Sequence, residues 1–197
     1  TEYMDYKILT EKVQNYCKSH LTEKRFKHSL RVAQMCSEIA ELSGYDKNKA
    51  YLAGIAHDIC KEIPHDEMIA LAESSDFPVT EGERMRISLL HGKAGAQFLK
   101  REFGIDDDEF FYAIGYHVCG RGDFGILGKI LYVADKNERG RPHVLRDPDF
   151  IKNLYNNSLD DMFYYTVKGN YEYVKTKPGF IIMDESMEVV RALGIAE

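Results

Sequence analysis

The sequence predicts an all-α fold, in which a single helical bundle of 197 residues carries additional helices at its C-terminal end. Apolar residues recur at helical spacing in one segment after another, and glycines and prolines separate the segments. Only residues 180–183, Phe-Ile-Ile-Met, hint at a strand, and one strand cannot form a sheet. The length is sufficient for one domain with a sizeable core, and there is neither a repeat nor a convincing linker.

Composition excludes several classes of protein. Hydrophobic residues make up 44% of the chain, as in an ordinary soluble domain, and no run approaches the roughly 18 apolar residues of a membrane span. The chain shows no signal-peptide pattern, so we expect a cytoplasmic protein without membrane contact. Four widely spaced cysteines favour neither a disulfide framework nor a zinc knuckle. A formal net charge of −6 without a basic block argues against binding to a nucleic-acid polymer.

The first part of the chain contains three predicted helices, over about residues 3–19, 22–42 and 46–57. Thr22 is a typical N-cap for the second helix, and Gly44 a typical C-terminal stop. The third helix is rich in alanine and contains Gly54, so its backbone can approach a neighbour closely. We therefore expect it to be central and buried.

The middle of the chain predicts further helices over about residues 66–74, 81–90, 91–103, 106–117 and 126–135. Gly104 ends one of them, and Asp106 with Glu109 resembles a capping box at the start of the next. Residues 139–142, Arg-Gly-Arg-Pro, form a basic, irregular connection. Residues 149–197 are helical again, with Ser158 as an N-terminal cap.

Six residues that can bind a metal stand near the ends of five different predicted helices. Adjacent side chains on a helix point about 100° apart, so a histidine directly before an aspartate can face the same spot only where the backbone ends or bends. Taken alone, each of these histidines is more typical of a core or surface residue, and each aspartate of a helix-end charge. Together they predict one cluster of mixed imidazole and carboxylate ligands, formed by His28, His57, Asp58, His91, His117 and Asp135.

The order of these residues resembles that of the HD-domain metal-dependent phosphohydrolases. The sequence is most similar to their YqeK-type branch, the symmetrical bis(5′-nucleosyl)-tetraphosphatases. The resemblance covers a metal-binding core of about residues 20–145, leaving 149–197 as a helical C-terminal extension. It is carried by the segments Arg-Phe-Lys-His-Ser at 25–29, Ala-Gly-Ile-Ala-His-Asp-Ile-Cys-Lys at 53–61, His-Gly at 91–92 with Gly-Ala at 95–96, Ala-Ile at 113–114, and Tyr-Val-Ala-Asp at 132–135.

The resemblance implies two divalent transition metal ions, with iron favoured over manganese or another metal. It implies that one ion is bound by His28, His57, Asp58 and Asp135, and the other by Asp58, His91 and His117. Asp58 would bridge the two ions and, with Lys61, carry catalysis. The cations expected to neutralise substrate phosphates are Arg25, Lys93 and Arg141, although a solvated surface lysine is an equally good interpretation of Lys93.

The implied reaction is symmetrical cleavage of diadenosine tetraphosphate, or a related dinucleoside polyphosphate, into two nucleoside diphosphates. Two departures from the family pattern, Val118-Cys119 after His117 and Arg139 in place of a proline, concern the substrate rim. Alternatives are a di-iron oxygenase with the same ligand order, another HD-domain nucleotide phosphohydrolase, or a non-catalytic nucleotide-binding module. The sequence implies a nucleotide or polyphosphate as partner and leaves a homodimer open.

Overall fold

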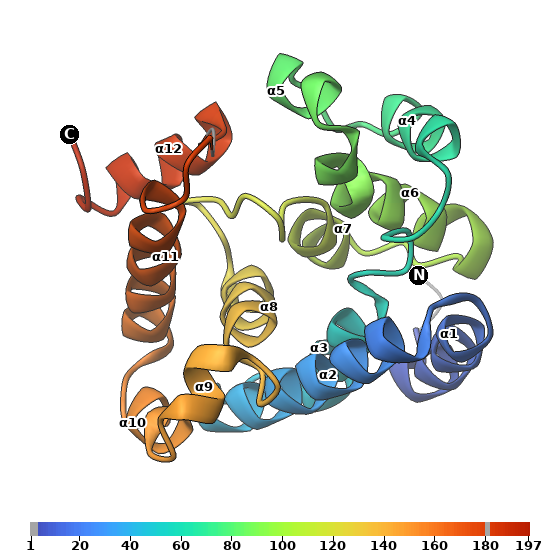
Figure 1. The fold of residues 1–197 in the computed structure, drawn as a ribbon. Helices are drawn as coiled ribbons and strands as arrows, with labels where there is room; N and C mark the ends of the chain where they lie inside the picture. The colour runs from blue at the N-terminus through green and yellow to red at the C-terminus, as the bar shows by residue number, and fades with distance from the viewer. Residues whose placement is uncertain (1–3, 180–181) are drawn as a thin grey trace.

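A computed structural model describes residues 4–179 and 182–197 of the chain. Within these ranges every regular element is a helix, which confirms the all-α prediction (Figure 1). The α-helices are α1 (Tyr6–His20), α2 (Glu23–Ser43), α3 (Lys47–Ala56), α4 (His65–Glu73), α5 (Glu81–Met85), α6 (His91–Phe103), α7 (Asp108–Gly115), α8 (Ile126–Asn137), α9 (Pro142–Arg146), α10 (Phe150–Tyr155), α11 (Leu159–Lys175) and α12 (Asp184–Ala192), with a 3₁₀ turn η1 (Ile87–Leu90) before α6.

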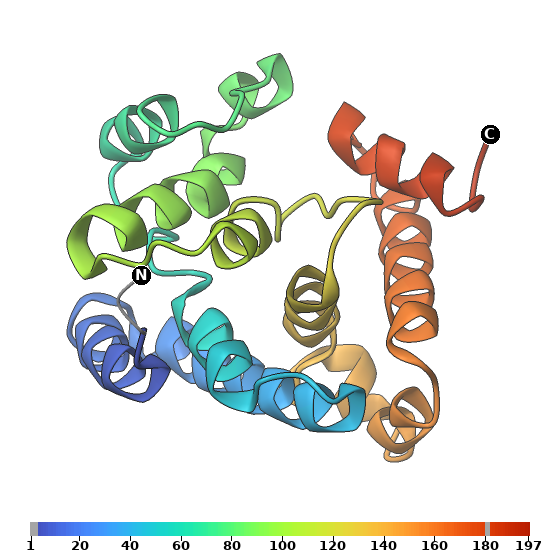
Figure 2. The ribbon, with the colours of Figure 1, turned by 180° about the vertical axis from the view of Figure 1, so that it is seen from behind.

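The pairing of α2 with α3 forms the base of the fold, and α1 packs against α3 (Figures 1 and 2). The predicted caps of α2 are present: the Thr22 hydroxyl accepts from the Arg25 amide, and Gly44 adopts a φ of 68° that favours glycine. The two helices touch at Gly54, where an added Cβ would lie 2.4 Å from the Cα of Ala33. This close contact requires glycine and brings the end of α3 against the middle of α2.

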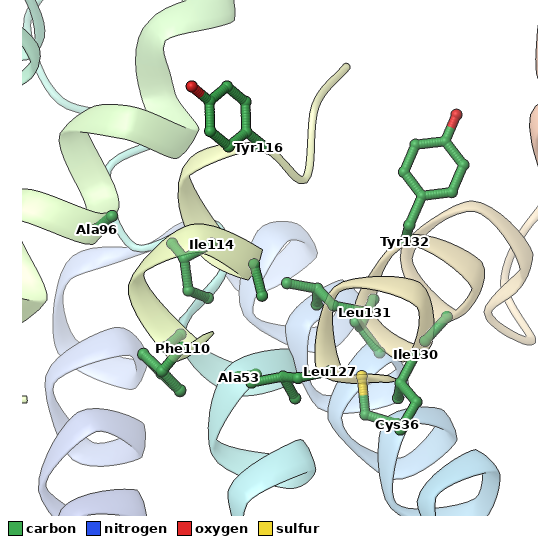
Figure 3. Close-up of a cluster of buried hydrophobic side chains, with 14 of the residues drawn as sticks. Cys36, Ala53, Ala96, Phe110, Ile114, Tyr116, Leu127, Ile130, Leu131 and Tyr132 are labelled. Atoms are coloured by element: carbon green, nitrogen blue, oxygen red, sulfur yellow. The ribbon is translucent and has the colours of Figure 1, made fainter. Parts of the chain in front are cut away.

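Helix α8 runs through the middle of the molecule and packs against α2, α3, α7 and α11. Apolar side chains gather where α3, α7 and α8 meet, including Ala53, Ile114, Leu127 and Leu131 (Figure 3). Helix α6 covers α7, and α4 covers α6. These contacts bring the ends of helices that are distant in sequence to one side of α8.

The C-terminal helices continue from α8, with α11 packed along α8 and α12 packed against α11 (Figure 1). Helix α9 begins at Pro142, the last residue of the predicted loop, in agreement with the preference of proline for a first helical position. Of the segment that hinted at a strand, residues 180–181 lie outside the described residues, as does residue 3 of the first predicted helix. Residues 182 and 183 belong to no regular element.

One predicted cap is wrong by a residue. Helix α7 starts at Asp108, and its N-cap is Asp107, whose carboxylate accepts from the Phe110 amide at 2.9 Å. The sequence offers three consecutive aspartates at this point, so the pattern alone does not decide which one caps the helix. No helix in the described part of the chain is both long and apolar enough to cross a membrane.

Candidate metal centre and active site

The six candidate ligands come from five places in the fold and meet in one buried cluster. One stands on α2, two in the turn that follows α3, one at the start of α6, one in the turn after α7 and one on α8. Each is at most 7% exposed. They form three overlapping sets of three residues, and within each set the ligand atoms lie within 4.8 Å of one another. The structure therefore brings together all six residues that the sequence singled out as metal ligands: His28, His57, Asp58, His91, His117 and Asp135.

The break after α3 explains how adjacent residues can face one centre. The helix ends at Ala56, and residues 57–62 continue as turns. His57 keeps helical dihedral angles as the C-cap, and the turns that begin there bring the Asp58 carboxylate beside its imidazole. The Nε2 atom of His57 lies 3.3 Å from Oδ2 of Asp58.

Each of the four histidines has its Nδ1 atom occupied by a protein acceptor. Nδ1 of His57, His91 and His117 lies 2.6, 2.6 and 2.7 Å from the backbone carbonyl oxygen three residues earlier. Nδ1 of His28 lies 3.1 Å from a carboxylate oxygen of Glu138. Because these oxygens can only accept, Nδ1 carries the proton and donates, and the Nε2 lone pair is directed at the cluster.

The carboxylate of Asp58 joins two groups of ligand atoms. Its Oδ1 lies 3.3 and 3.5 Å from Nε2 of His91 and His117. Its Oδ2 faces His57 and, at 3.6 Å, Nε2 of His28. Oδ1 of Asp135 completes the second group. It lies 3.2 Å from Nε2 of His28 and 3.4 Å from Nε2 of His57. One carboxylate thus lies between two neighbouring sets of ligands.

This arrangement fits bound cations better than it fits the protein groups alone. The Nε2 atoms of His91 and His117 are only 3.2 Å apart, and both carry lone pairs when Nδ1 holds the proton. The Nε2 atom of His57 is fully buried and has no hydrogen-bond partner among the described residues. A buried polar atom without a partner is costly, and a cation would satisfy these acceptors.

The electrostatics of the protein groups agree with a site for positive charge. For His57, burial lowers the pKa, but the carboxylates of Asp58 and Asp135 outweigh it and raise the value to about 10, so without a cation a proton occupies Nε2 in its place. Burial alone would raise the pKa of Asp58, yet the neighbouring histidines hold it well below its usual range. For Asp135 burial is likewise outweighed, mainly by Lys136. The cluster therefore keeps both carboxylates ionised and attracts cations.

Three of the predicted cations lie around the cluster. Nη1 of Arg25 donates to Oδ2 of Asp58 at 2.9 Å. Arg141 donates from Nη2 to the carbonyl oxygen of Asp135 at 2.6 Å and to its Oδ1 at 3.2 Å. Lys61 is half-buried, and burial lowers its pKa. Its ammonium has no hydrogen bond or ion pair within the described part of the chain, so it remains available to an anionic ligand.

The fourth predicted cation, Lys93, lies away from this group. It is 2% exposed, and its Nζ donates to Glu83 Oε1 at 2.6 Å, to Glu185 Oε1 at 3.2 Å and to the carbonyl oxygen of Pro78 at 2.6 Å. Two positions along a helix correspond to about 200°, so Lys93 points to the face of α6 opposite His91. It joins α5, α6 and α12.

Sequence reasoning missed the residues that orient the ligands. Glu138 accepts from Nδ1 of His28 and is itself held by the guanidinium of Arg31, with Nε 2.5 Å from Oε2. Lys136 donates to Oδ2 of Asp135 at 2.8 Å. The available signal was spacing: Arg31 follows His28 by three residues, so both occupy one face of α2.

The comparisons with known proteins agree with this geometry. The family model described as HD domain matches residues 25–140, which contain all six clustered residues. The chain belongs to the HD domain family. Two relatives, from Staphylococcus aureus and Bacillus subtilis, are both named symmetrical bis(5′-nucleosyl)-tetraphosphatase. The first is 35% identical over 159 residues, which are 78% of this chain and 79% of the relative. The second is 31% identical over 160 residues, which are 81% of this chain and 84% of the relative.

A solved structure of an HD protein extends the likeness over nearly the whole chain. It is described as a predicted HD superfamily hydrolase involved in NAD metabolism from Clostridium acetobutylicum. Its TM-score is 0.83 at 30% identity, and the match covers 94% of this HD protein and 96% of the other. The C-terminal helices beyond the HD match therefore belong to a fold that both proteins share.

Proposed function

We propose that this HD protein is a metal-dependent phosphohydrolase that cleaves diadenosine tetraphosphate, or a related dinucleoside polyphosphate, into two nucleoside diphosphates. The observation that carries the proposal is the placement of Asp58 between two sets of buried ligand atoms. Two adjacent cation sites sharing one carboxylate suit in-line attack on a phosphoryl group. The names of the two bacterial relatives support the same substrate.

His28, His57, Asp58 and Asp135 would bind one ion, and Asp58, His91 and His117 the other. Mixed nitrogen and oxygen ligands suit iron, manganese and similar divalent metals, and we favour iron. When bound, such ions polarise a phosphoryl oxygen and lower the pKa of water enough to provide a nucleophile at neutral pH. The protein contributes the orientation of the ligands, through three backbone carbonyls and Glu138.

The surrounding cations would select the phosphorus that is attacked. Lys61 offers a partly desolvated ammonium near Asp58 that has no ion pair among the described residues, and charge developing on phosphate oxygens is stabilised most strongly in such surroundings. Arg25 and Arg141 hold the carboxylates of Asp58 and Asp135, and we propose that their remaining N–H groups also contact phosphates. If these cations engage about two phosphates on the leaving side, the attack falls in the middle of a tetraphosphate and releases two diphosphates.

The product distinguishes the proposal from its alternatives. Metal-replete protein should convert diadenosine tetraphosphate to ADP alone, with or without oxygen, and a chelator should stop the reaction. ATP with AMP would exclude symmetrical cleavage, and a product formed only with oxygen would favour the oxygenase alternative. Chromatography of the nucleotides separates these results.

The ligand set can be tested by metal content. His57→Ala, Asp58→Ala and Asp135→Ala should lose bound metal together with nearly all turnover, whereas His65→Ala, at an exposed position of α4, should behave as wild type. If replacement of His91 or His117 left full metal content and activity, the two-metal assignment would be wrong. A cytoplasmic location and a homodimer stay predictions from the sequence.

A further inference from the structure

A cavity lies beside the ligand cluster, between α8, α11, α12 and the η1 segment. Its volume is about 200 Å³. The wall on α8 is formed by Tyr132 and Lys136, and the wall on α11 by Asn170 and Tyr171. Val118, which follows His117 in sequence, also lines it.

Lys136 connects the cavity with the cluster. Its Nζ lies 2.8 Å from Oδ2 of Asp135 and 3.4 Å from the carbonyl oxygen of His117. The same ammonium lies 4.8 Å from the centre of the Tyr132 ring, and both residues line the cavity. The cavity therefore opens beside the ligands, and a cation stands at the junction.

The chemistry of the walls suits a flat, mostly apolar group with polar edges. The lining combines the aliphatic side chains of Val118, Val167, Val174 and Val190 with two tyrosine rings, and its polar groups include the amide of Asn170. Two cationic side chains, Lys136 and Arg86, also line the cavity, and most of the remaining lining is hydrocarbon or aromatic. Small-molecule sites of this mixed kind bind aromatic ring systems, and aromatic walls stack with nucleobases.

We propose that this cavity binds the nucleoside of one half of the substrate, with Lys136 contacting the phosphate nearest to it. The inference rests on the proposed function, because a dinucleoside polyphosphate that places its phosphates on the cluster must direct each nucleoside away from it. The cavity that begins at Lys136 can receive one of these nucleosides.

The position of the cavity assigns a role to the C-terminal helices. The HD domain match ends at residue 140, whereas Asn170 and Tyr171 belong to α11 and Val190 to α12. The HD part holds the ligand cluster, and the C-terminal part supplies most of the base-binding wall. Recognition of the nucleoside therefore lies in the extension, and a chain shortened before α11 would lose it.

The test compares two tyrosines that stand two positions apart on α11. Tyr171 lines the cavity, whereas Tyr173 does not and is 59% exposed. Metal-loaded wild type, Tyr171→Ala and Tyr173→Ala are assayed with diadenosine tetraphosphate, and ADP and pyrophosphate serve as competitive inhibitors. Pyrophosphate carries the same phosphates as ADP without the nucleoside. Thermal melting shows that each variant is folded, and Asn170→Ala replaces Tyr171→Ala if the latter does not fold.

In Tyr171→Ala, the inhibition constant of ADP and the KM of the dinucleotide should rise about tenfold, the usual order for loss of one base–aromatic stack. The inhibition constant of pyrophosphate and kcat should stay unchanged, as should every constant in Tyr173→Ala. Equal weakening of ADP and pyrophosphate, or no weakening of either, would overturn the proposal.

Failure of the proposed function gives a different result. If wild type hydrolyses no dinucleoside polyphosphate, calorimetric titration of the metal-loaded protein with ADP and with pyrophosphate replaces the kinetic assay. Tighter binding of ADP that depends on Tyr171 would then support the nucleoside site while the hydrolase assignment fell. Indifference of ADP binding to Tyr171 would overturn the site itself.

Discussion

Replacement of Lys93 by methionine should destabilise the fold without altering substrate affinity. The ammonium is 2% exposed and lies within 3.2 Å of carboxylate oxygens of both Glu83 and Glu185, while methionine keeps most of the hydrocarbon stem. Removing one partner of a buried ion pair typically costs about 3–5 kcal/mol, because the remaining charge stays buried without compensation. For a chain of this size, about 2–4 °C of Tm is lost per kcal/mol, so the Tm should fall by roughly 6–20 °C.

The destabilisation should depend on pH in a defined direction. Burial already raises the pKa of Glu83 above 4.5, and loss of the ammonium raises it further. A carboxyl whose pKa is higher in the folded than in the unfolded state binds more protons when folded, so its contribution to stability falls as pH rises. The difference in Tm between wild type and Lys93→Met should therefore be larger at pH 8 than at pH 5.5.

The control is Lys100→Met, at an exposed position of the same helix, which should change the stability by no more than about 0.5 kcal/mol. Thermal unfolding followed by circular dichroism provides the Tm, and steady-state kinetics provides KM. An unchanged Tm together with a raised KM in Lys93→Met would refute the structural role and restore the interpretation of Lys93 as a phosphate-binding cation.

Four further outcomes are expected. Glu138→Gln should weaken metal binding about 10–100-fold, measured by chelator competition, since it removes the charged partner of a ligand histidine. Metal affinity should rise with pH between about 6 and 9, because protons compete with the metal for His57. Burial lowers the pKa of His57, but two carboxylates outweigh it and raise the value to about 10. A metal affinity that does not change with pH would argue against imidazole ligands. Gly54→Ala should cost at least about 1–3 kcal/mol of unfolding free energy through overpacking, whereas Gly169→Ala, with nothing within 4 Å of the added methyl, should be neutral or stabilising. Lys61→Met should lower kcat/KM by about 10²-fold while bound metal, measured by elemental analysis, is unchanged.

Local signals predicted the helices and the positions of the clustered residues. Thr22 and Gly44 act through the backbone beside them, so the ends of α2 were visible in the sequence. The end of α3 at the His-Asp pair was also predictable, because adjacent side chains can bind one centre only where the helix ends or bends. These features depend on few neighbours, and a single sequence contains them.

Features that depend on packing between distant helices were not predictable. The contacts of the Lys93 ammonium depend on α5 and α12, which bring Glu83 and Glu185 to the face of α6 opposite His91. In the same way, Arg141 follows Asp135 closely in sequence, but its hydrogen bond to the carbonyl oxygen of Asp135 requires the turn between α8 and α9. A motif identifies such a cation without showing what it contacts.

The spread of the ligands along the chain has a consequence for folding itself. His28 and Asp135 are 107 residues apart in sequence, yet Nε2 and Oδ1 are 3.2 Å apart in the folded protein. A cation held by both, and by the residues between them, acts as a reversible cross-link across the HD part of the chain. Binding free energy of this kind is folding free energy, because the unfolded chain presents no preformed site. Resistance to heat and to proteases should therefore follow the supply of metal, and a cell short of that metal would hold less of the protein as well as a less active one.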